Sequence, residues 1–273
     1  MQDENTGGLS DVKHIVAIAS GKGGVGKSTT TANIALAMAA AGHKVGVLDA
    51  DIYGPSQGLM LGVTSGSHPE AMGEKWFVPL VAHGVKVMSM AFLVDENSPM
   101  VWRGPMAAGA LQQMLLQTHW GKLDYLFVDM PPGTGDIQLT MSQKAKLTGA
   151  VIVTTPQDLA LLDARKGIEM FAKVQVPVLG IVENMSTHVC SQCGHEEAIF
   201  GAHGGAQLAK DYGTELLASL PLSMDIRLQA DAGNPSVAAD PQGAAAVSYS
   251  HLAQALNNKI GQAPAGPSIS IED

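Results

Sequence analysis

The chain is poor in charged and aromatic side chains. Asp, Glu, Lys and Arg make up 15% of its 273 residues, against about 25% in ordinary domains. The formal net charge is −9. A protein that holds nucleic acid through a general phosphate-binding face needs clustered Lys and Arg. The charge balance therefore argues against nucleic acid as a partner.

Cysteines and long apolar runs are scarce as well. The most apolar stretch, residues 32–42, is too short to span a bilayer, and no basic segment followed by an apolar run marks a secretory signal. The two cysteines are too few for a disulfide framework. We therefore expect a cytoplasmic protein that does not bind membranes.

Hydrophobic residues make up 46% of the chain, which indicates a globular core. Continuous apolar segments alternate with helical ones and predict a single α/β domain with a doubly wound, mostly parallel sheet and helices on both faces. The expected strands are 14–20, 44–48, 85–91, 124–129, 150–154, 176–182 and 215–219, and the expected helices 27–41, 106–118, 137–146, 159–174, 204–212 and 241–257. Residues 52–84 are expected to be irregular. Residues 1–13 are interpreted as a mobile leader, 14–258 as the folded domain and 259–273 as a disordered tail.

A phosphate-binding loop is predicted at residues 21–28 (GKGGVGKS), which match G-x-x-x-x-G-K-[ST] between an expected strand and an expected helix. Glycines let backbone N–H groups turn toward phosphate oxygens, and the helix start adds its positive dipole end. Lys27 is expected to reach the β- and γ-phosphates of ATP, and the Ser28 hydroxyl to bind Mg²⁺. The predicted nucleotide-binding residues of the loop are Gly21, Lys22, Gly23, Gly24, Val25, Gly26, Lys27, Ser28 and Thr29.

Several carboxylates follow expected strands directly. Asp129 ends the strand 124–129 and suits Mg²⁺, usually through a water, while Asp136 closes the glycine-rich turn behind it. Asp49 and Asp51 follow the strand 44–48, and Asp49 is expected to support the turn there. Any one of these could simply cap a helix. Their common place at carboxyl ends of strands, where open α/β sheets bind ligands, favours a site.

Cys190 and Cys193 form a C-x-x-C pair whose two thiolates can face one metal. Zinc sites and iron–sulfur clusters usually need four ligands, which a symmetric dimer of this chain would supply. A zinc site aided by His188 or His195 is an alternative, because thiolates bind both metals. A redox pair and two inert cysteines are further alternatives.

The second lysine of the loop, Lys22, makes the sequence KGGVGKST resemble the deviant Walker A group, which includes MinD, ParA and nitrogenase iron protein. The resemblance implies that Lys22 crosses a dimer interface to the partner's nucleotide. It also implies that Asp51 positions or activates the attacking water, so that Lys22, Lys27 and Asp51 are the expected catalytic residues. Asn184 is implied to contact adenine.

The ordered motifs KGGVGKST, LDADIYGPS, DMPPGTGD, VENMS and CSQCGH resemble the Mrp (ApbC) family of P-loop iron–sulfur cluster carriers over residues 14–256. The resemblance implies an ATP-hydrolysing homodimer that holds a bridging [4Fe–4S] cluster and transfers it to apo-proteins. Many members carry an extra N-terminal domain or a four-cysteine motif. Neither feature is seen in this sequence, so we expect no second permanent cluster and expect a separate cluster scaffold as a partner.

The alternative function is that of a spatial organiser of the MinD or ParA kind with a zinc-bridged dimer. Membrane-binding forms need a basic amphipathic C-terminal helix. The segment 256–261 (LNNKIG) has no basic stripe, and neither membrane binding nor DNA binding by itself explains the C-x-x-C.

Overall fold

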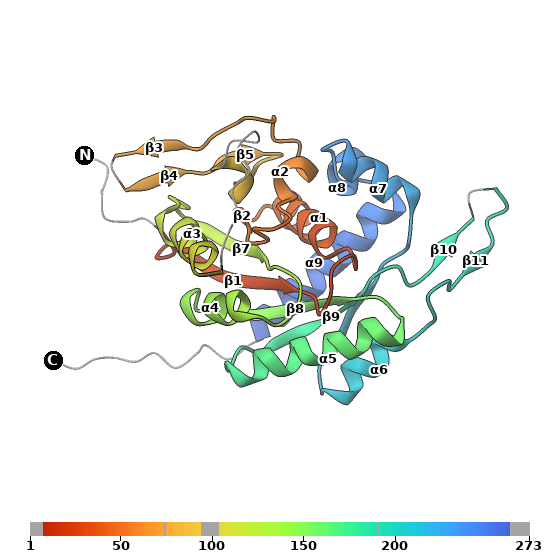
Figure 1. Ribbon diagram of the computed structural model, residues 1–273. Coiled ribbons are helices and arrows are strands. Elements are labelled where there is room, and N and C mark those ends of the chain that lie inside the picture. The colour runs from red at the N-terminus through yellow and green to blue at the C-terminus, as the bar shows by residue number, and fades with distance from the viewer. Residues whose placement is uncertain (1–7, 74, 94–103, 191, 263–273) are drawn as a thin grey trace.

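The computed structural model describes residues 8–73, 75–93, 104–190 and 192–262. Eight strands form the central sheet: β1 (Val12–Ala19), β2 (Val45–Asp49), β5 (Leu80–Ala82), β6 (Val85–Ser89), β7 (Leu123–Asp129), β8 (Gly149–Thr154), β9 (Val178–Glu183) and β12 (Leu216–Ser219). Their order is β12-β9-β8-β1-β7-β2-β6-β5, and every neighbouring pair is parallel except β5 with β6 (Figure 1). The predicted α/β fold with a mostly parallel sheet is confirmed.

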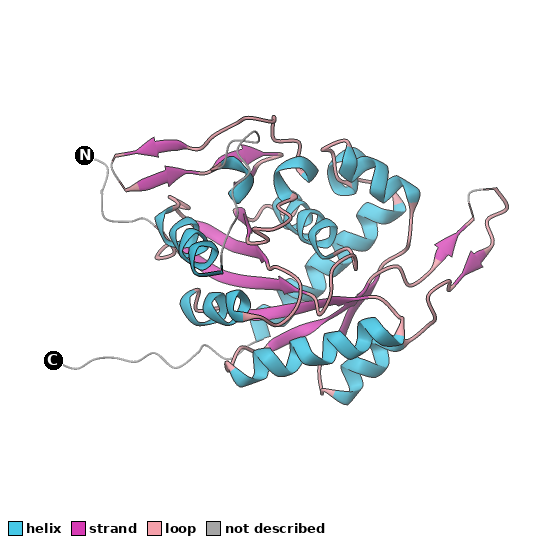
Figure 2. Ribbon diagram, viewed as in Figure 1, coloured by secondary structure: helices cyan, strands magenta, loops and turns pink. Residues whose placement is uncertain are grey.

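Helices cover both faces of this sheet (Figure 2). One hydrophobic layer lies under α1 (Lys27–Ala40), α7 (Met224–Asp231), α8 (Ser236–Ala239) and α9 (Ala244–Gln262), the other under α3 (Gly104–Gln117), α4 (Asp136–Lys144), α5 (Asp158–Lys173) and α6 (Gly204–Asp211). In β1, Val16 and Ile18 enter the first layer, while Ile15 and Ala17 enter the second. Because successive side chains point to opposite faces, a continuous apolar strand fills both layers.

The segment that was expected to be irregular contains short elements. These are α2 (Gln57–Met60), β5 and a hairpin of β3 (Glu70–Met72) with β4 (Trp76–Val78), followed after β6 by the 3-10 helix η1 (Met90–Phe92). Helices α7 and α8 were also missed. Three-residue strands are too short to show an alternating pattern, and α2 and α8 span about one turn each.

Both predicted domain boundaries need correction. Strand β1 begins at Val12, which pairs with Leu123, so the last two residues of the expected leader belong to the sheet. Helix α9 continues to Gln262, because Ile260 extends the buried face of Leu252 and Leu256 at four-residue spacing. The parts of the expected leader and tail at 1–7 and 263–273 lie outside the described residues. Among the helices that the structure describes, none has the length and apolarity needed to cross a membrane.

Candidate functional site

The predicted phosphate loop joins β1 to α1 at the carboxyl edge of the sheet. Gly26 caps α1 with a φ of 83°, a left-handed conformation that favours glycine. A Cβ at Gly26 would lie 2.1 Å from Asn184 Nδ2, and one at Gly21 would lie 2.1 Å from the carbonyl carbon of Asp163 in α5. The loop therefore lies in close contact with Asn184, which directly follows β9, and with α5, and glycine is required at both positions.

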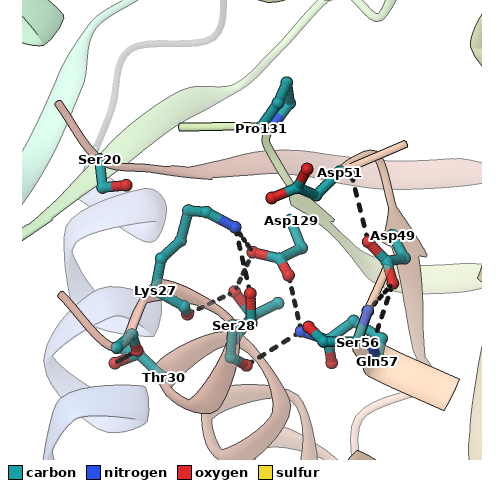
Figure 3. A network of polar contacts seen from close by, with 12 residues as sticks. Ser20, Lys27, Ser28, Thr30, Asp49, Asp51, Ser56, Gln57, Asp129 and Pro131 are labelled. Atoms are coloured by element: carbon teal, nitrogen blue, oxygen red, sulfur yellow. Dashed lines mark hydrogen bonds and ion pairs between the residues drawn. The ribbon is translucent and has the colours of Figure 1, made fainter. Parts of the chain in front are cut away.

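Lys27 and Asp129 form a buried ion pair at the centre of the site (Figure 3). Lys27 Nζ lies 2.5 Å from Asp129 Oδ1 and also donates to Ser28 Oγ at 3.2 Å. Thr31 Oγ1 donates to the same Asp129 oxygen at 3.2 Å. The side chain of Lys27 is 6% exposed and that of Asp129 is 0% exposed, so water screens this pair little.

Asp49 lies beside Asp129 in register on the neighbouring strand and is also fully buried. Its carboxylate accepts from the backbone N–H groups of Asp51 (3.2 Å), Ser56 (2.8 Å) and Gln57 (3.0 Å). These bonds confirm that Asp49 supports the turn. Burial, and after it the charge of Asp129, raises the pKa of Asp49 to about 7.

Asp51 is half-buried and faces the loop. Burial raises the pKa of Asp51, and the positive charge of Lys27 partly offsets this rise. A cavity of about 200 Å³ opens between these groups, and its walls contain Ser20, Gly23, Gly24, Gly26, Lys27, Ser28, Thr29, Asp51, Met60 and Pro132. The structure thus brings six of the nine predicted phosphate-loop residues and Asp51 around one cavity. Its lining does not include Gly21, Lys22, Val25, Asp129 or Asn184.

Two contacts to Asp129 were not predicted from the sequence. One comes from Thr31, one helical turn after Lys27 and therefore on the same face of α1. The other comes from Gln57, whose Nε2 donates to Asp129 Oδ2 at 2.8 Å and to the Ser28 carbonyl oxygen at 2.9 Å. The four-residue spacing between Lys27 and Thr31 could have indicated that Thr31 faces the site. No comparable sequence signal identifies Gln57.

Asn184 holds the phosphate loop through a hydrogen bond to the backbone of Val25. It is 6% exposed, and its Nδ2 donates to the Val25 carbonyl oxygen at 2.9 Å. Its contact with adenine stays a prediction. Asp136 is the first residue of α4, and its part in the site also stays a prediction.

The two cysteines lie on the loop of a hairpin formed by β10 (His188–Val189) and β11 (Glu196–Glu197), which projects from the body of the molecule (Figure 1). The Cys190 N–H donates to the His195 carbonyl oxygen, and the Gly194 N–H donates to the Cys190 carbonyl oxygen, each at 2.9 Å. Backbone N–H groups of Gln192 and Cys193 hold the pKa of the Cys190 thiol below its ordinary value. Cys193 is exposed, so the pair is accessible to a metal.

Within the described part of the chain, no three His, Cys, Asp or Glu side chains gather into a group that could hold a metal ion. Nδ1 of His188, a suggested zinc ligand, lies 3.2 Å from the Leu222 carbonyl oxygen. Metal binding by Cys190 and Cys193 stays a prediction, and the described residues around them supply no third ligand.

The sequence model of the family described as ParA: NUBPL iron-transfer P-loop NTPase matches residues 11–257. The chain belongs to this family. The resemblance to Mrp-type P-loop NTPases is thereby confirmed.

A Pseudomonas fragi relative named iron–sulfur cluster carrier protein is 66% identical over 246 residues, which are 90% of this chain and 86% of the relative. A solved nucleotide-binding protein from Archaeoglobus fulgidus, in complex with ADP and with cobalt found, is 40% identical; the match has a TM-score of 0.72 and covers 82% of this chain and 88% of that one. The cell division ATPase MinD of Pyrococcus furiosus is 23% identical with a TM-score of 0.66 over 90% of this chain and 98% of that one, and it shows the shared fold.

Proposed function

We propose that this NUBPL-family NTPase is a cytoplasmic homodimer that binds and hydrolyses ATP, holds a bridging [4Fe–4S] cluster and transfers it to apo iron–sulfur proteins. One observation carries the proposal: the chain combines a P-loop site with a pair of accessible cysteines, beside which the described residues supply no third metal-binding side chain. A second copy would supply the two missing thiolates. The name of the Pseudomonas fragi relative supports the same function.

The residues around the loop fit ATP with Mg²⁺. Two buried carboxylates, Asp49 and Asp129, share one buried ammonium group, that of Lys27, so the site has a surplus of negative charge that suits a cation. Ser28 and Asp129 are hard oxygen donors of the kind that Mg²⁺ prefers. Bound there, Mg²⁺ would neutralise charge on the phosphates.

In ATP hydrolysis, Lys27 and the loop N–H groups bind the phosphates, and Asp51 acts on the attacking water. Lys27 exchanges its contact with Asp129 for the β- and γ-phosphates, and N–H groups of the loop bind phosphate oxygens. Asp51, which borders the cavity, orients the attacking water. The pKa of Asp51 is raised above that of a solvated aspartate. This brings it nearer to neutral pH, where a carboxylate accepts a proton from water more readily.

Exposed apolar side chains at the carboxyl edge support a homodimer. Tyr53 follows β2, Leu159 and Leu162 begin α5 after β8, and Met224 begins α7 after β12; between 52% and 67% of each is exposed. Such a gathering at one edge is typical of an interaction surface. The Lys22 ammonium group has no ion-pair partner among the described residues, which suits a role across the interface.

The coupling between nucleotide and cluster follows from this arrangement. Loss of the γ-phosphate would release the segments after β2 and β7, which contain Asp51 and Pro132. A changed dimer geometry would alter the distance between the two cysteine hairpins. Cluster transfer to an apo-protein should therefore run at different rates with ATP, with ADP and without nucleotide, and equal rates would contradict this coupling.

The experiment that tests the proposal is oxygen-free purification and reconstitution, followed by measurement of iron, sulfide, zinc and oligomer size. About two irons and two sulfides per chain in a dimer support one shared cluster. Zinc at about half an atom per chain that iron cannot replace contradicts the carrier function and indicates a zinc-bridged ATPase. ATP hydrolysis measured on the same preparation tests the nucleotide half separately.

A further inference from the structure

Gln57, the first residue of α2, lies closer to the centre of the site than its loop position in the sequence suggests. Its side chain is 0% exposed, and its Nε2 donates both to Asp129 Oδ2 and to the Ser28 carbonyl oxygen (Figure 3). Its backbone N–H donates to Asp49 Oδ2 at 3.0 Å. One residue therefore links both buried carboxylates to the start of α1.

The two acceptors fix the orientation of the Gln57 carboxamide, because only its nitrogen can donate to both oxygens. The other amide atom, Oε1, must then act as an acceptor. It is buried and has no hydrogen-bond partner among the described residues. A buried acceptor without a partner is costly, and such an atom in a native structure calls for an explanation.

The surroundings indicate the kind of donor that is missing. Gln57 Nε2 contacts the Asp129 carboxylate and the Ser28 backbone carbonyl. Asp129 and Ser28, the latter through its hydroxyl, are the two residues to which the proposed function assigns Mg²⁺. Mg²⁺ keeps several of its waters in protein sites, and a buried water commonly bonds to otherwise unsatisfied polar groups. The donor that suits Oε1 is a water of the Mg²⁺ shell.

We propose that Gln57 is a positioning residue of the magnesium site: its Nε2 orients Asp129 and Ser28, and its Oε1 accepts a hydrogen bond from a water that Mg²⁺ retains. The inference rests on the proposed function, because it requires ATP and Mg²⁺ at this site. Outer-shell partners of this kind typically contribute about 10- to 100-fold to metal affinity. Gln57 also joins Mg²⁺ binding to the Asp51 loop, since Asp49 holds both the Gln57 and the Asp51 N–H groups.

The test compares ATP binding by calorimetry in EDTA and across a Mg²⁺ titration. Gln57→Met keeps the volume but removes both amide functions. We expect the Mg²⁺ concentration for half-maximal enhancement of ATP affinity to rise about tenfold or more, with affinity in EDTA changed much less. Gln57→Glu keeps an acceptor but adds charge beside Asp129, so it should weaken binding in EDTA and increase the gain from Mg²⁺. A merely structural role would move both variants in one direction.

Gln229→Met is the matched control. Gln229 lies in α7, and its Oε1 is also buried without a partner in the described chain. Within that part of the chain, its side chain takes no part in the hydrogen bonds of Lys27, Asp49 and Asp129. It should keep the wild-type Mg²⁺ requirement. If wild type shows a Mg²⁺ requirement that Gln57→Met shares, this inference fails alone. If wild type binds no ATP even with Mg²⁺, the proposed function fails and the inference with it.

Discussion

Asp49 and Asp129 are register partners at the carboxyl ends of β2 and β7, and neither has any exposed side-chain surface. Of these two carboxylates, Lys27 bonds only that of Asp129, while Asp49 accepts from backbone N–H groups and the Ser89 hydroxyl. Two buried carboxylates so close together resist full ionisation. Repulsion between the two carboxylates therefore destabilises the site, and a bound cation would reduce this repulsion.

The raised pKa of Asp49 predicts that the stability of the folded chain falls as pH rises. The pKa of Asp49 is about 7 in the folded chain, above the value of about 3.9 for an unfolded aspartate. Between these two values the folded chain binds more protons than the unfolded chain, so its free energy of unfolding should fall as pH rises. The slope is at most about 1.4 kcal/mol per pH unit. Urea unfolding between about pH 5 and about pH 8 should show this fall, and Asp49→Asn should reduce it.

The matched control for that prediction is Asp124→Asn. A hydrogen bond from Lys13 lowers the pKa of Asp124, so its contribution has the opposite sign and is lost only as pH falls below the ordinary range of aspartate. The slope between pH 5 and 8 should be unchanged in this variant, to within about 0.3 kcal/mol per pH unit. A wild-type stability that rises with pH across this window would contradict the assignment to Asp49.

Lys27→Met removes the buried ammonium group that is bonded to Asp129. Breaking one partner of a buried pair typically costs about 3–5 kcal/mol, because the other charge is left uncompensated. We expect a loss of that order in the free energy of unfolding at pH above the Asp49 pKa, together with loss of ATP binding and hydrolysis. Lys44→Met, which changes an exposed lysine before β2, should change neither. Retained ATP hydrolysis by Lys27→Met would contradict the phosphate-loop assignment.

The sequence predicted the parts of this site that local patterns encode. Residues 21–28 lie between an apolar strand and a helix, and Asp129 ends a strand, so chain order alone places both at one sheet edge. The role of Gln57 could not be predicted, because it depends on how α2 folds back against α1 and β7. The same holds for the packing of Asn184 beneath Val25. Both contacts join segments far apart in the chain, and one sequence carries no signal for them.

Lys22→Ala should separate dimer formation from nucleotide binding. Lys22 does not line the cavity of its own chain, so ATP affinity of the monomer should change little, by about threefold or less. We expect the variant to lose the ATP-dependent shift to a dimer in sedimentation velocity. Lys44→Ala serves as the control for loss of a lysine charge. A Lys22→Ala dimer that forms with ATP as in wild type would contradict a role across the interface.

Cys190→Ser and Cys193→Ser should each abolish the bound cluster and leave ATP binding unchanged. The described residues offer no third ligand near the pair, so loss of one cysteine per chain leaves at most two thiolates in the dimer. Iron and sulfide per chain after anaerobic reconstitution, with ATP affinity measured on the same sample, check this. His195→Ala should retain wild-type iron content, because the carrier function needs only the four cysteines. Loss of metal in His195→Ala would instead support the zinc alternative.

Gly21→Ala should show that close contact with α5 fixes the phosphate loop. An added Cβ would lie 2.1 Å from the carbonyl carbon and 2.2 Å from the carbonyl oxygen of Asp163, and backbone atoms cannot turn away as a side chain can. Overpacking of this kind typically costs about 1–3 kcal/mol, and the loop must shift away from α5, so both stability and ATP affinity should fall. Gly167→Ala changes a glycine one turn further along the same helix, where a Cβ meets nothing within 4 Å. It should stabilise α5 by about 0.5–1 kcal/mol and leave ATP binding intact. Equal effects of the two variants in urea unfolding and calorimetry would mean that α5 does not hold the loop in place.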